Sequence, residues 1–487
     1  MSAIETDYLI VGAGAAGMAF GDSMLAESDS ELVLVDRRHR PGGHWNDAYP
    51  FVRLHQPSAY YGVNSRVLGN DSISQFGADA GFYERATAAE ICDYFQRVLD
   101  EHLLPSGRVR FFGMCDYVGD WSNEHHFVSR ITGTATAVRV RRKLVDATYL
   151  EPKIPSTHTP SFQIDSDVRL IPVNELVRLS SPGAGYTVIG AGKTAMDACI
   201  WLLENGVAAD TIQWIRPRDS WILNRAFVQP LDLLDSLVEG FSLQLEASAE
   251  AETTKDLFDR LEASEQLLRL DRSVEPTMFH CPILSQSELE TLRCIENVVR
   301  MGRISRIGTN TIELGGGSVP TSANRVYVDC TGDGIRRVPV RPIFEPDRIT
   351  LQQVRTCQPT FNAALAAFME CARDDEDEKN RLCPAHPYPD TALGWLSVTS
   401  FAQRTQTLWL EQADLIGWLE RSRLSLTRGL YERAGDPEIQ PALMRALANA
   451  EPAVENLERL LSQAGQPPTP ARCAPGRLRG RRSRQLP

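Results

Sequence analysis

Two glycine-rich segments, far apart in the chain, have the spacing that binds the phosphates of a dinucleotide. Each follows a short apolar run and precedes an apolar-periodic helix, which is the G-x-G-x-x-G/A pattern of a βαβ nucleotide site. The first glycine makes the tight turn, the second lets backbone amides approach a pyrophosphate, and the third small residue lets helix and strand pack closely. The helix N-terminus then faces the phosphate charge. The small residues are Gly12, Gly14 and Gly17 in the first segment and Gly190, Gly192 and Ala195 in the second.

The end of the strand that follows the first turn indicates which dinucleotide binds there. Residues 31–36 read as that strand and end on Asp36. A carboxylate at this place accepts hydrogen bonds from adenosine ribose hydroxyls and repels a 2′-phosphate, so the first turn suits FAD or NAD(H). We also expect contacts from Ala15, Ala16 and Arg37, although a solvated charge at a strand end explains Arg37 at least as well.

The corresponding strand after the second turn, residues 211–215, ends without an acid. Arg216 and Arg218 follow it, and two guanidinium groups suit the bidentate contacts of a 2′-phosphate. The second turn therefore favours NADPH over NADH, with Arg216 weighted slightly above Arg218. Lys193 and Thr194, at the start of the next helix, are candidates for contact with the pyrophosphate, and a surface position for Lys193 is an equal alternative.

Composition excludes several other classes of protein. The chain has 487 residues, of which 43% are hydrophobic and 23% charged, as in an ordinary globular enzyme of two or three domains. A formal net charge of -12 argues against nucleic acid as a general partner, and no apolar stretch approaches the length of a membrane span. The first strand begins almost at once and leaves no room for a signal peptide, so we expect a cytoplasmic protein.

The ten cysteines are scattered, and no two lie within four positions of each other. This spacing excludes a C-x-x-C redox pair and any recognisable zinc site, and we expect reduced thiols. Without a second redox centre, oxygen or a small organic acceptor is the remaining sink for electrons.

The predicted elements describe an α/β protein with two Rossmann-like dinucleotide-binding domains, a helical insertion and a helical C-terminal region. The insertion either covers a substrate or adds packing. The expected divisions are 1–155 for the first part of an FAD-binding domain, 156–322 for an NADPH-binding domain with the insertion at about 228–300, 323–375 for the second part of the FAD-binding domain, 376–464 for the helical region and 465–487 for a disordered basic tail.

Over about residues 5–375 this arrangement resembles the two-dinucleotide flavoproteins and, among them, the class B flavin monooxygenases. That group includes the flavin-containing, Baeyer–Villiger and N-hydroxylating enzymes. Besides the two turns and Asp36, the similarity rests on a Gly-Gly-x-Trp segment at 42–45 and on Asp-Cys-Thr-Gly at 329–332. It implies FAD and NADPH as cofactors, with further contacts from Gly43, His44, Trp45, Gly332 and Asp333.

Two departures limit what the resemblance implies about activity. Tyr149 replaces a glycine of the family, and the linker 162–172 lacks the F-x-G-x-x-x-H signature, whose histidine couples NADPH position to oxygen chemistry. Three functions therefore stay open. They are a monooxygenase, an NAD(P)H-dependent reductase or dehydrogenase without oxygen transfer, and a flavin-binding protein that acts through partners, for which the basic tail is the only support.

In the monooxygenase interpretation the flavin carries the redox step through a (hydro)peroxyflavin, and the partners are molecular oxygen and a small organic molecule, with specialised metabolism as one setting. Residues 54–62 are similar in place to the loop under the flavin ring. From this region we select Gln56, Tyr60 and Asn64 as catalytic candidates, with Gln56 first because an amide both donates to and accepts from a peroxide.

Overall fold

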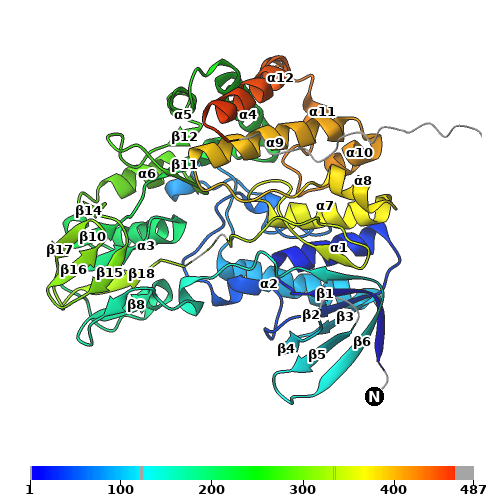
Figure 1. Ribbon diagram of the computed structural model, residues 1–487, viewed down its shortest axis with the longest axis horizontal. Coiled ribbons are helices and arrows are strands. Elements are labelled where there is room, and N and C mark those ends of the chain that lie inside the picture. The colour runs from blue at the N-terminus through cyan, green and yellow to red at the C-terminus, as the bar shows by residue number, and fades with distance from the viewer. Residues whose placement is uncertain (1–2, 121–123, 333, 335, 467–487) are drawn as a thin grey trace, which may run out of the picture.

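The computed structural model describes residues 3–120, 124–332, 334 and 336–466. Two lobes lie side by side, and helices from the middle and the end of the chain lie across both (Figure 1). Each lobe is built on a sheet in which one of the parallel strands leads into a glycine turn. Across the parts of the chain so described, no helix is both long and apolar enough for a bilayer crossing.

The first lobe contains a seven-stranded sheet in the order β3-β2-β1-β6-β5-β4, with β19 beside β6. β1, β2 and β3 are parallel, and β6 and β19 continue the parallel part, so the glycine turn after β1 lies at the carboxyl edge of the sheet. The centre of β1 is buried because helices cover the sheet. The strands are β1 (Ile4–Val11), β2 (Leu32–Val35), β3 (Val109–Phe112), β4 (Cys115–Tyr117), β5 (His125–Ser129), β6 (Ala135–Asp146) and β19 (Arg348–Thr350), and the helices are α1 (Ala15–Glu27), α2 (Ala88–Val98) and α7 (Pro359–Ala372).

The second lobe repeats this plan with a five-stranded parallel sheet in the order β14-β10-β9-β18-β8. Its glycine turn joins β9 to α3, and α6 packs beside α3. A small mixed sheet completes the lobe. The elements are β8 (Arg169–Pro172), β9 (Tyr186–Ile189), α3 (Lys193–Glu204), β10 (Ile212–Ile215), α6 (Gln286–Arg293), β14 (Val298–Val299) and β18 (Val326–Asp329), with β7 (Gln163–Ile164), β15 (Ile304–Ile307), β16 (Thr311–Leu314) and β17 (Gly317–Pro320) in the small sheet.

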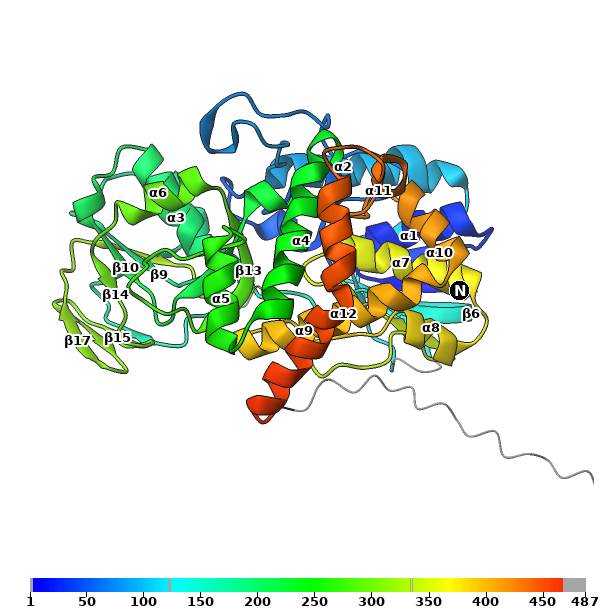
Figure 2. The same cartoon turned by 90° about the horizontal axis from the view of Figure 1, so that it is seen from above.

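The remaining helices form a layer over the two lobes. α4 and α12 lie side by side, with α9 crossing beneath them (Figure 2). Their apolar faces pack against a three-stranded sheet in the order β12-β11-β13. The elements are β11 (Ser220–Asn224), α4 (Leu234–Glu250), α5 (Thr254–Ala263), β12 (Leu267–Leu268), β13 (Met278–Leu284), α8 (Glu376–Leu382), α9 (Ala392–Leu410), α10 (Ala413–Arg421), α11 (Leu430–Arg433) and α12 (Gln440–Gln463).

The observed sheets correct two of the expected divisions. β18 pairs with β9 and β8 in the second lobe, so the chain returns to the first lobe at β19 and not at residue 323. The insertion at 228–300 is only partly helical, because β12 and β13 lie within it. Its helix α6 packs beside α3 in the second lobe. Of the expected tail, residues 467–487 lie outside the described part of the chain.

Candidate dinucleotide-binding site

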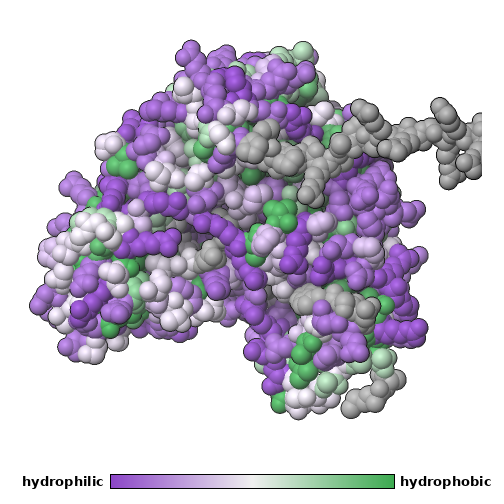
Figure 3. Space-filling view, viewed as in Figure 1, coloured by the Kyte–Doolittle hydropathy of each residue, from purple (hydrophilic) through white to green (hydrophobic). Residues whose placement is uncertain are grey.

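A single cavity of about 1020 Å³ lies between the lobes and is lined by both glycine turns. The carboxyl ends of β1 and β2 face it from one side, and those of β9 and β10 face it from the other. This is where open parallel sheets bind their ligands. The volume is at the upper end of the usual range for cofactor sites, about 300–1,000 Å³. In Figure 3 the surface is hollowed between the two lobes.

In the first turn, the protein itself requires two of the three glycines. Gly12 has φ +97°, and a Cβ there would lie 2.9 Å from Cγ2 of Thr148. A Cβ at Gly17, which does not line the cavity, would lie 1.9 Å from the Gly12 carbonyl oxygen. Gly14 is different, because its φ is −70° and the nearest atom to a Cβ is the Gly43 Cα at 3.5 Å. A side chain at Gly14 would therefore conflict only with a ligand.

The second turn divides its small residues in the same way. Gly190 has φ +139°, and its Cβ would lie 3.0 Å from the Cys330 carbonyl oxygen. Ala195 is fully buried against the sheet and does not line the cavity. Gly192 lines the cavity, and no protein atom lies within 4 Å of the position its Cβ would take. Both turns thus keep a glycine that the fold does not need, at the place where a pyrophosphate approaches the backbone.

Asp36 lies directly after β2 and is held by the first turn. Its carboxylate accepts hydrogen bonds from the backbone N–H groups of Ala13 and Arg38, both at 2.7 Å. Burial raises the pKa of Asp36, and these N–H groups oppose the rise. Asp36 lines the cavity. The neighbouring Arg37 also lines the cavity, and its half-exposed guanidinium pairs with Glu151.

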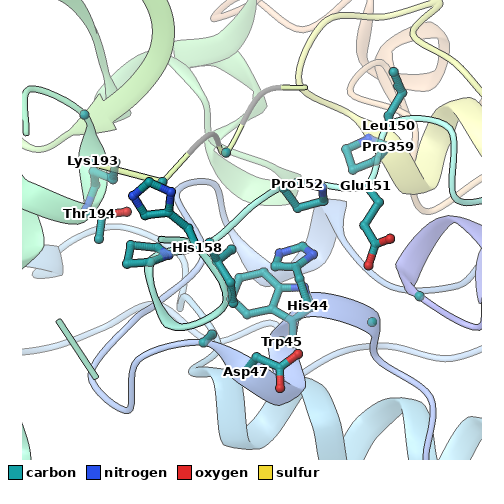
Figure 4. Close-up of a pocket in the computed structure, with 18 of the residues that line it drawn as sticks. His44, Trp45, Asp47, Leu150, Glu151, Pro152, His158, Lys193, Thr194 and Pro359 are labelled. Atoms are coloured by element: carbon teal, nitrogen blue, oxygen red, sulfur yellow. The ribbon is translucent and has the colours of Figure 1, made fainter. Parts of the chain in front are cut away.

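The Gly-Gly-x-Trp segment packs directly on the first turn as the short helix Gly43–Asp47. A Cβ at Gly43 would lie 2.9 Å from the Gly14 Cα, which explains a glycine at this point. The Trp45 indole N–H donates to the Tyr61 hydroxyl at 2.8 Å, and His44 lies beside the indole ring. Burial lowers the pKa of His44 to about 4, so this imidazole is neutral at pH 7. His44 and Trp45 face the cavity opposite Lys193 and Thr194 (Figure 4).

Lys193 begins α3 and is a cavity residue, not a surface residue. Its side chain is buried and pairs with Asp197 one turn later on the helix. The Tyr49 hydroxyl donates to the other oxygen of Asp197 at 2.6 Å. The ammonium group therefore has a fixed position beside the second turn, at the edge of the cavity that Gly192 also lines.

The two arginines after β10 differ in whether they reach the cavity. The structure favours Arg218 over Arg216 for contact with a 2′-phosphate, which reverses the order expected from the sequence. Arg216 is fully buried, lies 4.4 Å from the centre of the Trp214 ring and does not line the cavity. Within the described chain its guanidinium makes no hydrogen bond, and burial lowers its pKa to about 10. Arg218 lines the cavity and donates to Asp390 at 3.2 Å. Two cations that the sequence did not indicate, Arg303 and Arg337, line the same cavity.

Of the three catalytic candidates, only Gln56 lines the cavity. Its amide nitrogen makes a long hydrogen bond of 3.5 Å to the Tyr60 carbonyl oxygen. The Tyr60 hydroxyl points away and donates to the carbonyl of Gln229 at 2.9 Å. Asn64 is turned toward the C-terminal helices and accepts from Ser422 at 2.9 Å. The structure therefore places the side chains of Tyr60 and Asn64 away from the cavity, bonded to Gln229 and Ser422.

The two central strands end in turns of the same geometry. After β6, Asp146 accepts from the backbone N–H and the hydroxyl of Thr148 at 2.8 and 2.7 Å. After β18, Asp329 accepts from the same two groups of Thr331 at 2.9 and 2.6 Å. Gly332 follows and lines the cavity from the second lobe, whereas Asp333 lies outside the described residues. His158, which carried no signal in the sequence, also lines the cavity and bonds to the Thr331 hydroxyl at 3.0 Å.

A buried ionic network joins the lobes behind the cavity. Arg225 pairs with Glu288 at 2.6 Å and with Asp79 at 2.8 Å, and Arg85 pairs with the same two carboxylates. Burial would raise the pKa of Glu288, but Lys193, Arg225 and Arg85 outweigh it and lower the value to about 2.

The network also fixes the chain just before Gln56. Arg85 donates to the Leu54 carbonyl at 3.0 Å, and Arg225 reaches the His55 carbonyl at 3.5 Å. Burial, with the nearby cations, lowers the pKa of His55 to about 3. No local sequence pattern indicates this network, because its members come from three separate segments.

Comparisons with known proteins agree with the nucleotide-binding fold. Residues 10–63 match the family model described as an NAD(P)-binding Rossmann-like domain. A flavin-containing monooxygenase from Stenotrophomonas maltophilia is 15% identical, with a TM-score of 0.45 over 76% of this chain and 98% of its own. A caprolactone-bound cyclohexanone monooxygenase is 13% identical, with a TM-score of 0.48 over 93% of this chain and 98% of its own. Likenesses this distant carry no argument about activity.

Two mycobacterial proteins are much more similar. They are "Uncharacterized protein Rv2000" of Mycobacterium tuberculosis (strain ATCC 25618 / H37Rv) and "Uncharacterized protein Mb2023" of Mycobacterium bovis. Each is 47% identical over 428 residues, which are 88% of this chain and 79% of the relative. The protein with the two-turn cavity described above therefore belongs to the family of Rv2000 and Mb2023.

Proposed function

We propose that this protein is an FAD- and NADPH-dependent monooxygenase that oxygenates a small organic molecule. The observation that supports the proposal is that both glycine turns line one cavity. Dinucleotides held at the two turns would direct their reactive rings into one shared space, as electron transfer between them requires. FAD supplies the redox and oxygen chemistry when bound, and the chain supplies orientation, charge and exclusion of water.

The residues of the first turn fit FAD. The N-terminus of α1 and the backbone at Gly14 suit its pyrophosphate, since only a ligand needs that glycine. Asp36 is placed to accept from ribose hydroxyls with the lone pairs that its two backbone hydrogen bonds leave. Its negative charge disfavours a 2′-phosphate at this turn.

The residues around the second turn fit NADPH. Gly192 leaves room for the pyrophosphate at the N-terminus of α3, and Lys193 adds positive charge beside it. Arg218, Arg303 and Arg337 line the cavity and supply cations for the additional phosphate. His280 lines the cavity with them. Burial lowers its pKa despite the nearby Asp390, so its imidazole is neutral at pH 7.

Replacing Arg218 with Ala should reduce the preference for NADPH over NADH by roughly tenfold or more, since a charge-assisted hydrogen bond contributes about 1.5–3 kcal/mol. Arg216→Met is the matched control. It should leave the preference unchanged, because Arg216 does not line the cavity and its ion-pair partner at 3.6 Å, the buried Asp219, keeps its hydrogen bonds from Arg300. Apparent affinities from anaerobic flavin reduction by each nucleotide measure both effects. A loss of preference in Arg216→Met alone would restore the assignment made from the sequence.

Gln56→Ala should divert electrons to hydrogen peroxide while NADPH still reduces the flavin at a near-normal rate. The Gln56 amide lines the cavity and is poorly satisfied by its 3.5 Å bond to Tyr60, so it is available to hold a reacting oxygen group. A neutral hydrogen bond contributes about 0.5–1.5 kcal/mol, so a severalfold rise in peroxide per NADPH is expected. Tyr60→Phe, which changes a hydroxyl bound to Gln229, is the control and should not change this ratio.

A reductase without oxygen transfer is the second candidate, and the linker favours it. Residues 163–172 form β7 and β8 in the second lobe, and of the linker only Phe162 lines the cavity. The position where the family has its histidine therefore does not reach the cavity in this chain. A flavin-binding protein acting through partners is the third candidate, and its only support, the basic tail, lies outside the described residues.

One experiment tests the proposal against both alternatives. The purified protein is assayed for released FAD, then reduced anaerobically with NADPH, then exposed to oxygen with panels of amines, sulfides and ketones. Oxygen incorporation into a product, measured with ¹⁸O₂ by mass spectrometry, supports the monooxygenase. NADPH oxidation matched by reduction of an organic acceptor, with no oxygen incorporated, would replace it with the reductase.

A further inference from the structure

Two cysteines that are distant in the sequence meet at the wall of the cavity. Cys281 lies in β13, and Cys357 lies just before α7. Both line the cavity, and both pack on the apolar cluster beneath α9. Interaction with the Cys281 side chain, and then burial, raise the pKa of Cys357 well above its usual range.

The backbone is unusual at both cysteines. Cys281 has φ +53° and Cys357 has φ +63°, in the left-handed region that residues with a Cβ seldom adopt. The pairing of β13 with β11 shifts register between Phe279 and Ile283, so Cys281 lies in an irregular stretch of the strand. Two separate segments thus hold unfavourable conformations where the thiols meet. Conformations of this kind persist where the surrounding structure enforces them, often at functional sites.

Aromatic side chains connect this pair with the first turn. Tyr388 lines the cavity, and burial raises its pKa well above the usual range, as do the neighbouring Cys357, Cys281 and Tyr61. Tyr61 in turn accepts the indole N–H of Trp45, which follows Gly43. The two thiols, Tyr388 and Tyr61 thus all line the same cavity.

We propose that Cys281 and Cys357 form a reversible dithiol–disulfide centre that exchanges two electrons with the dinucleotides of this cavity. The electron donor rests on the proposed function, whereas formation of the S–S bond depends only on the two side chains. The centre would provide a second electron acceptor, although the sequence contains no C-x-x-C pair. It would direct the enzyme toward small disulfides or thiols as co-substrates.

The exchange is balanced in electrons and protons. In the oxidising direction the two S–H bonds break and one S–S bond forms, and two electrons and two protons pass to a small-molecule disulfide, which leaves as two thiols. In the reducing direction the S–S bond breaks. Bound NADPH and FAD would supply two electrons and one proton, and water would supply the second proton, so that two S–H bonds form.

The thiol environment determines how this centre would react. Thiol–disulfide exchange requires a thiolate, and the pKa of Cys357 is raised. At neutral pH Cys357 is therefore held as a thiol and reacts slowly with thiols and disulfides in bulk solvent. Its rate of oxidation by glutathione disulfide should rise as the pH is raised toward the pKa of Cys357.

The test follows the bond directly. Protein equilibrated with glutathione disulfide is alkylated, digested and searched by mass spectrometry for a peptide that links residues 281 and 357. Wild-type protein should give this link, and FAD-loaded oxidised protein should take up two more electrons per chain from dithionite than its flavin accepts. Cys281→Ser and Cys357→Ser should each abolish the link and the two additional electrons. Cys294→Ser, which changes an exposed cysteine remote from the cavity, should abolish neither.

The failure of this inference and that of the proposed function are distinguishable. Absence of the link over the whole range of glutathione potential, with electron uptake limited to the flavin, overturns the dithiol centre and leaves the flavoenzyme intact. A link in protein that binds no FAD overturns the proposed function and keeps the redox pair. Equal thiol loss in wild type and both serine variants would show oxidation elsewhere and also overturns the centre.

Discussion

Gly14→Ala should give a folded protein that retains little or no FAD. The φ of Gly14 is allowed for alanine, and the nearest atom to the new methyl group, the Gly43 Cα, is at the ordinary contact distance of 3.5 Å. The methyl group would instead occupy the space through which a pyrophosphate approaches the backbone. We expect affinity for FAD to fall at least tenfold, or about 1.4 kcal/mol or more. Flavin absorbance after gel filtration, beside a circular dichroism spectrum, measures cofactor and fold together.

Two other glycines of α1 are controls for this prediction. Gly21→Ala places a methyl group 3.7 Å from Ile10 Cδ1 in the middle of the helix and should keep both FAD and fold. Gly17→Ala places it 1.9 Å from the Gly12 carbonyl oxygen and should disrupt folding itself. Full flavin content in Gly14→Ala would show that no pyrophosphate lies on this turn. The equivalent change at Gly192 should weaken NADPH without changing FAD.

Glu288→Gln should be destabilising, by up to about 3–5 kcal/mol, because it leaves two buried cations to share Asp79 as their one remaining carboxylate. Arg225 and Arg85 both pair with this carboxylate and are themselves buried. Glutamine keeps the size of the side chain and can still accept from the Ser285 N–H, so the cap of α6 is preserved. Glu290→Gln, on the exposed side of the same helix, should cost little. Urea unfolding midpoints of the two variants measure the difference.

The same carboxylate gives a direction to the pH dependence. The pKa of Glu288 is lowered from 4.5 to about 2, so the native state stabilises the ionised form. Its contribution is complete above pH 4.5, the unfolded value, and is lost as the pH falls toward 2. Wild-type stability should therefore decline through this range more steeply than that of Glu288→Gln. The double variant Arg225→Met with Glu288→Met should cost less than Glu288→Gln alone, because it removes both members of the pair.

The sequence by itself determined the features that depend on short stretches of backbone. A tight turn, a phosphate approach and close helix packing each demand a small residue at a fixed spacing, so both turns could be located without a structure. Asp36 was predictable for the same reason, since the end of the next parallel strand lies beside the turn. The Gly43–Trp45 segment was recognisable by its own residues, and the contact between Gly43 and Gly14 gives the physical reason.

Only the tertiary structure decided which side chains face the cavity. Arg216 and Arg218 are two positions apart, yet one packs under Trp214 and the other reaches the ligand space, because the chain leaves the sheet between them. The side chains of Tyr60 and Asn64, two of the catalytic candidates, bond to Gln229 and Ser422 and do not face the cavity.

Side chains brought together across the two lobes were also beyond the sequence. Cys281 and Cys357 show no motif spacing, and the members of the Glu288 network come from three segments, so no local pattern indicates either. Such contacts depend on how the lobes and the helical layer pack together. Long-range packing depends on the burial of whole faces of helices and sheets, so a short local pattern of residues does not indicate it.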